Sequence, residues 1–183
     1  TFLTGASHPE EIVTRAAELG LSAVAITDRN SLAGVVRAYT ALKHLREEVE
    51  AEIKIRSRHT VDSSSRLEIG TPESLGKPQT VRLPKLIVGC RLVLRDCPVE
   101  WIALPRDRAA YQRLSRLLTL GKRRAEKGQC ELDLRDMLDG AQGMILIALP
   151  QEQLSQCRAV IDQVQRRYPG HVFLGAVPCY DGS

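Results

Sequence analysis

The amino-acid sequence predicts an α/β fold in which short apolar strands alternate with amphipathic helices. Of the 183 residues, 43% are hydrophobic and 26% are charged, which is typical of a globular domain with one substantial core. Short apolar runs such as 22–27 and 144–150 are separated by segments whose apolar residues recur at helical spacing. This alternation favours a parallel sheet or barrel whose strands are joined by right-handed crossovers.

The first predicted elements are a helix and a strand. Ser7 and Glu10 have the spacing of a capping box that would begin the helix. Apolar residues at helical spacing follow as far as Gly20, a residue type that suits a helix end. The sequence SAVAIT at 22–27 then predicts a short strand buried on both faces.

The middle of the chain combines a second helix with a segment of no clear period. Ser31 can cap this helix, which we expect to fade into the acidic run at 47–52. Residues 53–83 are rich in Ser, Arg, Gly and Pro, and we interpret them as a flexible insertion. Two apolar runs at 85–94 and 99–104 follow, and the turn between them favours a hairpin.

The last part of the chain predicts three helices and two strands. A long helix is expected over about 106–126, with an inner side formed by Ala110, Leu114, Leu117 and Leu118. The remaining expected elements are a short helix at 132–138, a strand at 144–150, a helix at 151–167 and a strand at 171–177.

Composition argues against several classes of protein. The net charge of +4 permits contact with nucleic acid without requiring it, and no run approaches the roughly 20 apolar residues of a membrane span. The five cysteines form no Cys-x-x-Cys pair, which argues against zinc and for a reduced, cytosolic chain. The chain begins without Met or a signal pattern and ends just after an apolar run, so we expect a fragment of a longer protein.

Asp28 follows the predicted strand at 22–27, a place where α/β folds often carry functional groups. A carboxylate there can ligate a metal ion or accept a proton. It can also accept hydrogen bonds from backbone N–H groups of the turn and the next helix. Considered alone, the residue favours this last, structural role.

Several longer segments resemble a known family. They are GASHPEEIVTRAAELGLSAVAITDRNSLAGVVRAY, LIVGCRLVL, DRAAYQRLSRLLTLGKRRAEKG and GMILIALP, in this order. They are similar to the PHP (polymerase and histidinol phosphatase) domain of bacterial C-family DNA polymerases, and SLAGVVRAY and LLTLGKRRAEKG favour its error-prone branch. The resemblance implies that residues 1–183 form an N-terminal domain with an incomplete, distorted β/α (TIM-like) barrel. In that family, His, Asp and Glu residues can hold a cluster of metal ions.

The resemblance also implies that the family's metal ligands are degenerate here. Asp28 matches the first residue of an Asp-His pair, but Arg29 stands in place of the His, and Arg91 stands in place of a glutamate. A guanidinium cannot coordinate a cation, and at about 4 Å it repels a unit positive charge by about 4 kcal/mol at an effective dielectric near 20. We therefore expect no catalytic and no metal-binding residues, and we hypothesise that Arg29 or Arg91 pairs with Asp28.

The histidines and Cys90 favour structural roles. His8, His44, His59 and His171 are not at metal-ligand spacing, which favours surface or capping positions. Cys90 lies within a predicted strand, where a buried, small apolar side chain is the simpler interpretation than a reactive thiol.

A basic run ends the helix predicted over 106–126. Cations there complement the helix dipole, so a solvated face is the simpler interpretation. Contact with phosphate groups is the alternative, without base stacking because no aromatic residues are interleaved. The candidates for phosphate contact are Arg113, Arg116, Lys122, Arg123 and Arg124.

The resemblance leaves three functions open. The first is a noncatalytic module of an error-prone DNA polymerase. Such a parent enzyme synthesises DNA across damage with Mg²⁺ in its palm domain, and this fragment needs no cofactor. The implied partners are the remaining polymerase domains, primer-template DNA and damage-response accessory proteins in the cytoplasm, with no membrane. The second is an active metal-dependent phosphoesterase or proofreading nuclease, and the third is a basic nucleic-acid-binding module.

Overall fold

A computed structural model describes residues 7–62, 83–151 and 153–176. The chain divides into two compact units. The larger unit comprises Thr1–Gly5, Ala25–Gly34 and Ile87–Ser183, and the smaller one comprises Ala6–Val24 and Val35–Leu86.

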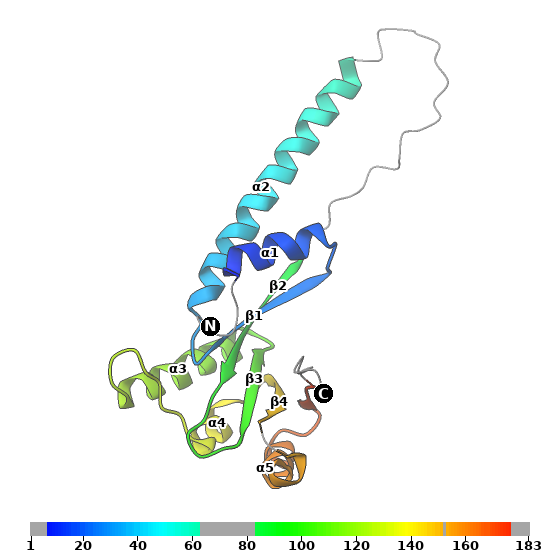
Figure 1. Ribbon diagram of the computed structural model, residues 1–183. Helices are drawn as coiled ribbons and strands as arrows, with labels where there is room; N and C mark the ends of the chain where they lie inside the picture. Colours follow the sequence, from blue (N-terminus) through cyan, green and yellow to red (C-terminus); the bar gives the residue numbers. More distant parts are fainter. Residues whose placement is uncertain (1–6, 63–82, 152, 177–183) are drawn as a thin grey trace. The chain divides into compact units, whose positions relative to one another are not determined.

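The strands form a five-stranded sheet in the order β1-β2-β3-β4-β5. Their bounds are β1 Ala23–Arg29, β2 Lys85–Leu92, β3 Val99–Pro105, β4 Met144–Pro150 and β5 Val172–Leu174. β2 and β3 pair antiparallel (Figure 1), which confirms the predicted hairpin. β4 and β5 pair parallel.

The sheet is mixed, so the parallel pairing that the alternation of strands and helices favours is found for β4 and β5 but not for β3 and β4. β3 and β4 pair antiparallel, with Pro105 opposite Met144. Two helices, α3 (Arg108–Arg124) and α4 (Leu134–Gly140), separate these strands in the chain. Because the second helix brings the chain back to the end of the sheet where β3 finishes, β4 runs in the opposite direction.

The first helix, α1, comprises Pro9–Glu18, and its N-cap is His8, one residue later than the expected cap Ser7. The carboxylate of Glu11 accepts a hydrogen bond from the backbone N–H of His8 at 2.8 Å, so the capping pair is His8 and Glu11 rather than Ser7 and Glu10. Glu10 is therefore left to form an ion pair with Arg37 within the same unit. The predicted stop is present, because Gly20 follows the helix with a φ of +65°.

The strand β1 and the helix α2 (Ala33–Asp62) differ from their expectations. Within β1, Ile26 is the one buried residue, so burial on both faces is wrong; β1 is the first strand in the sheet order. α2 does not fade at the acidic run but continues to Asp62, because Glu, Lys, Arg and Ala are strong helix formers. The segment interpreted as an insertion is thus helical from residue 53 to 62, and its residues 63–82 lie outside the described part.

The core of the larger unit lies between the sheet and its helices. β2, β3 and β4 present Cys90, Trp101 and Leu146 to it, all fully buried. The helices that supply the other side are α3, α4 and α5 (Leu154–Arg167). The four inner residues predicted for α3 are confirmed as buried, namely Ala110, Leu114, Leu117 and Leu118.

Gly121 allows the chain that follows α3 to pass close to this helix. A Cβ at this position would lie 2.7 Å from the Cys130 sulfur and 2.8 Å from Leu132, which is fully buried. The backbone N–H of Glu131 donates to the Gly121 carbonyl at 3.0 Å, so the two segments are also held together by their backbones.

We expect Gly121→Ala to lower the free energy of unfolding by about 1–2 kcal/mol, since overpacking a core costs more than the helix propensity gained. Gly140→Ala is the matched control in α4, because its Cβ would meet Leu117 at an ordinary 3.6 Å. Urea denaturation followed by the fluorescence of Trp101, the single tryptophan, measures both. Equal stabilities of the two variants would contradict the close approach at Gly121.

Candidate functional site

Three strands bring charged residues together on one side of the sheet. Arg91 of β2 lies opposite Ile102 of β3, so Glu100, two residues earlier, is its diagonal neighbour on the same face. The backbone N–H of Asn30 donates to the Arg91 carbonyl at 2.9 Å, which holds the end of β1 beside β2. Arg29 is thereby brought within reach of the same glutamate.

Glu100 accepts hydrogen bonds from both arginines, and we call these three residues the Arg–Glu–Arg cluster. Its Oε1 accepts from Arg29 Nη2 at 2.8 Å, and its Oε2 accepts from Arg91 Nε. The Glu100 side chain is 11% exposed, whereas those of Arg29 and Arg91 are 43% and 32% exposed. One nearly buried carboxylate therefore pairs with two partly exposed guanidinium groups. The cluster carries a net charge of about +1.

Asp28 has the role of capping the next helix that its position favours. Its Oδ2 accepts a hydrogen bond from the backbone N–H of Gly34, in the first turn of α2, at 2.8 Å. Its backbone carbonyl accepts from the Cys90 thiol at 3.4 Å. The carboxylate that contacts both guanidinium groups is Glu100, a residue that sequence analysis missed. A lone charge inside the apolar run VEWIAL was the signal that could have found it.

Asn30 fixes the turn that carries Arg29. Its φ of +45° lies in the left-handed region, which asparagine adopts more readily than most residues. Its side-chain amide donates to the Val93 carbonyl at 3.0 Å and accepts from the Val93 N–H at 2.9 Å. The turn after β1 is therefore tied to the end of β2 by side chain and backbone together.

Two of the three residues at the positions that the resemblance assigns to metal ligands, Arg29 and Arg91, cannot coordinate a divalent cation. Arg29 and Arg91 have no lone pair to donate, and they already surround the nearest carboxylate of the cluster. Across the described stretches of the chain, no group of three or more His, Cys, Asp and Glu side chains is placed to hold a metal ion.

The other single candidates occupy structural positions. His44 is exposed on α2, and His171 Nε2 lies 2.6 Å from Arg106 Nη1. The prediction of a buried Cys90 is confirmed, and burial raises the pKa of its thiol to about 12, which keeps it protonated and unreactive. His8 precedes α1, and the side chain of His59 lies outside the described part.

Comparison with known proteins gives the family. The PHP domain family matches residues 1–171. The chain belongs to the PHP domain family. This confirms the family that the resemblance indicated and the α/β class that it implied.

Relatives of this PHP domain are named error-prone DNA polymerases. The protein from Ruegeria pomeroyi is 71% identical over 183 residues, which cover 100% of this chain and 17% of that protein. Those from Rhodopseudomonas palustris (strain BisB5) and Brucella abortus are 36% and 38% identical over 185 residues, and this chain covers 14% of each. The chain therefore spans between about a seventh and a sixth of the length of these relatives.

Among solved structures, a candidate metal-dependent phosphoesterase from Bifidobacterium adolescentis aligns with 93% of this PHP domain and 82% of its own chain. The TM-score is 0.47 and the identity 12%, so the likeness is too weak to assign any property to this chain. In the part of the chain that the structure describes, no helix is long and apolar enough to cross a membrane.

Of the five basic residues proposed for phosphate contact, Arg116, Arg123 and Arg124 line one groove along α3, whereas Lys122 does not. Arg124 donates to both carboxylate oxygens of Asp136 at 2.6 and 3.0 Å. Arg113 donates to the Gln142 carbonyl at 2.7 Å. Arg116 and Arg123 are exposed along α3, while Lys122 lines a separate groove beside the turn after β1.

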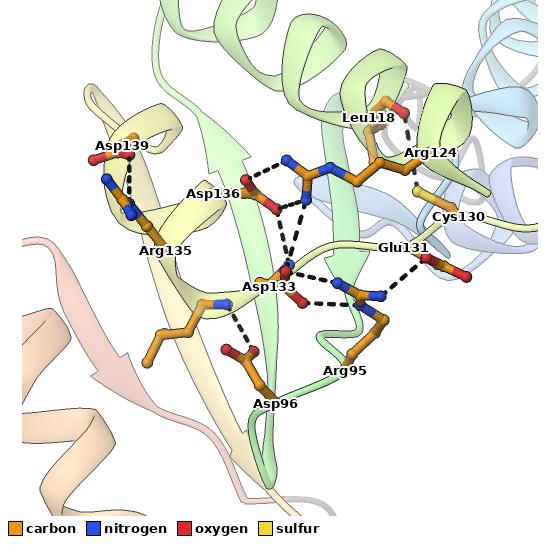
Figure 2. A network of polar contacts seen from close by, with 11 residues as sticks. Arg95, Asp96, Leu118, Arg124, Cys130, Glu131, Asp133, Arg135, Asp136 and Asp139 are labelled. Carbon is orange, nitrogen blue, oxygen red and sulfur yellow. Dashed lines mark hydrogen bonds and ion pairs between the residues drawn. The ribbon is translucent and has the colours of Figure 1, made fainter.

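Arg124 belongs to a network that ties together three segments (Figure 2). Arg95, in the turn between β2 and β3, donates to both carboxylate oxygens of Asp133 at 2.9 and 2.8 Å and to Glu131 at 3.0 Å. Arg124, at the end of α3, pairs with Asp136 of α4 and lies 3.7 Å from Asp133. These pairs hold the end of α3 and the start of α4 against the hairpin turn, so Arg124 has structural contacts.

We expect Glu100→Gln to lower the free energy of unfolding by about 2–3 kcal/mol, because it removes the charged acceptor of two guanidinium groups. Glu47→Gln is the matched control, since Glu47 is exposed on α2 and forms a 3.7 Å pair with Lys43. The control substitution should lower the free energy of unfolding by less than about 0.5 kcal/mol. Urea denaturation at pH 7 measures both, and a similar, small effect of the two substitutions would contradict the role of the cluster.

The network also predicts a pH dependence of stability. The hydrogen bond from Arg124 lowers the pKa of Asp136 below its ordinary value of 3.8, and that from Arg95 lowers the pKa of Asp133. A lowered folded-state pKa stabilises the fold above the unfolded-state pKa, and this stabilisation disappears as pH falls through the folded-state value.

The variant Asp136→Asn should therefore unfold at a lower urea concentration than the wild type at pH 7. The difference should shrink as the pH falls below about 3.8. Asp139→Asn is the control on the same helix, because Asp139 is 74% exposed and 4.0 Å from Arg135. A wild-type advantage over Asp136→Asn that stays constant from pH 7 to pH 3 would contradict this assignment.

Proposed function

We propose that this PHP domain is a structural, noncatalytic module of an error-prone DNA polymerase. Relatives with that name match the whole chain, and the chain covers 14–17% of three of them. The observation that carries the proposal is the Arg–Glu–Arg cluster. It puts guanidinium groups at positions that the family resemblance assigns to metal ligands.

Electrostatics supports a structural role for this site. A divalent cation placed about 4 Å from one guanidinium would be repelled by about 8 kcal/mol at an effective dielectric near 20. The carboxylate of Glu100 is already shared between two arginines. The cluster thus supplies internally the positive charge that a metal would bring, and it links three strands while doing so.

In this proposal, chemistry is carried out elsewhere in the longer protein. DNA-directed DNA synthesis across damage would use Mg²⁺ held in a palm domain, and this fragment would bind no cofactor. The module would steady the remaining polymerase domains near primer-template DNA in the cytoplasm, with damage-response accessory proteins as further partners. The relatives' shared name and the share of their length outside this chain support this division of labour.

The proposal is tested on the full-length protein with the variant Asp28→Asn. This change keeps an acceptor for the Gly34 N–H but weakens any metal ligation by the carboxylate. We expect the same content of Mn, Zn and Fe in the wild type and the variant. Primer extension with Mg²⁺ should proceed at rates within about twofold of each other, because a capping residue far from the chemistry leaves the catalytic step unchanged.

Asp139→Asn serves as the control for a general effect of removing an exposed carboxylate. A stoichiometric metal in the wild type that is lost in Asp28→Asn but kept in Asp139→Asn would overturn the proposal. Loss of hydrolysis of phosphate esters in the same variant would then favour a metal-dependent phosphoesterase or nuclease.

A further inference from the structure

A groove of about 550 Å³ opens beside the turn that follows β1. One wall is the turn itself together with the end of β2, and the other is the end of α3 with the loop that follows it. The groove is lined by Arg29, Asn30, Ser31, Val93, Lys122, Glu126, Lys127, Gly128, Gln129 and Cys130. All of these residues belong to the larger unit.

The charges that line the groove are mainly positive. Arg29, Lys122 and Lys127 face it together with one acid, Glu126. Among the residues that the structure describes, neither lysine has a carboxylate within ion-pair distance, in contrast to Arg95 and Arg124. Arg29 and Arg91 share the single negative charge of Glu100, so the positive charge of Arg29 is only partly compensated. A concave surface with this excess attracts anions.

The walls of the groove are built by structural contacts. The Asn30 amide is occupied by its two hydrogen bonds to Val93, which makes that wall rigid. Opposite it, the Gln129 N–H donates to the Glu126 carbonyl at 3.0 Å, and Gly128 turns with a φ of +92°. The volume lies within the usual range for small-ligand sites, and a rigid site loses less entropy when it binds.

The lining also limits the chemistry of the ligand. No aromatic side chain is among the residues around the groove, so it offers no stacking surface for a base. Its donors are ammonium and guanidinium groups and the Ser31 hydroxyl, which suit the oxygens of a phosphate group. The separate groove along α3 is less suitable, because one of its three basic residues, Arg124, is neutralised by Asp136.

We propose that this groove binds a phosphate group, contributed by a nucleic-acid strand or by a free phosphate compound. Lys122 and Lys127 are the main contacts, and Arg29 supplies a third cation from the Arg–Glu–Arg cluster. The site replaces the stripe of basic residues along α3 as the place of phosphate contact. It does not depend on the parent protein being a polymerase, since only the groove's own charge and shape are used.

The test is hydrogen–deuterium exchange of the full-length protein, because it reports on the groove even when DNA is also bound elsewhere. Pyrophosphate and a six-nucleotide single-stranded DNA are the two probes. We expect slower amide exchange in residues 126–130 with at least one of them. Protection by the oligonucleotide alone assigns the ligand to a strand backbone, and protection by both assigns it to phosphate in general. Absence of protection by either probe overturns the proposal.

The variant Lys122→Gln/Lys127→Gln should weaken the protection at least several-fold. For the oligonucleotide, the logarithm of the binding constant falls linearly with the logarithm of the salt concentration. The magnitude of this slope should decrease by about 0.7 for each phosphate group that the variant no longer binds. The matched control is Arg116→Gln/Arg123→Gln, which removes the same charge from the exposed face of α3. Equal effects of the two double variants would show nonspecific attraction and would overturn the assignment to the groove.

Discussion

The larger unit depends on the carboxylate of Glu100, which is nearly buried within the otherwise apolar strand β3. A buried carboxylate without partners would be strongly destabilising, since its charge would lose hydration without compensation. Arg29 and Arg91 supply that compensation from β1 and β2. The three strands that meet at this point are therefore linked by charge as well as by their backbone hydrogen bonds, and the ends of β1 and β2 are held in place.

This interaction also determines what the site can do. Family members can hold metal ions with acidic and imidazole side chains, whereas here two cations surround one acid. In our proposal, the groove at the same end of the sheet therefore attracts anions rather than cations. The guanidinium groups that bond to Glu100 compensate its negative charge, so the three strands can meet at this point without a bound cation.

The basic residues at the end of α3 divide into two groups for a similar reason. Arg124 is held by Asp136 and Asp133, and with Arg95 it joins two helices to the hairpin turn. Lys122 lies two residues earlier, which places it on a different side of the helix and along the groove. Two basic residues of one short run thus differ in their surroundings: Arg124 pairs with acids of the fold, and Lys122 lines the groove.

By itself, the sequence determined the order of the elements, the hairpin of β2 and β3, the buried side of α3 and the family. These features are local, because they depend on apolar periodicity, turn residues and continuous segments of similarity. Only the tertiary structure decided that Glu100 is the common partner of Arg29 and Arg91, and that β4 runs antiparallel to β3. Both depend on strand register and on the return path of the chain. Arg29 is 71 positions and Arg91 is 9 positions away from Glu100 in the sequence, and the strand register brings all three together. No periodicity within one chain specifies that register.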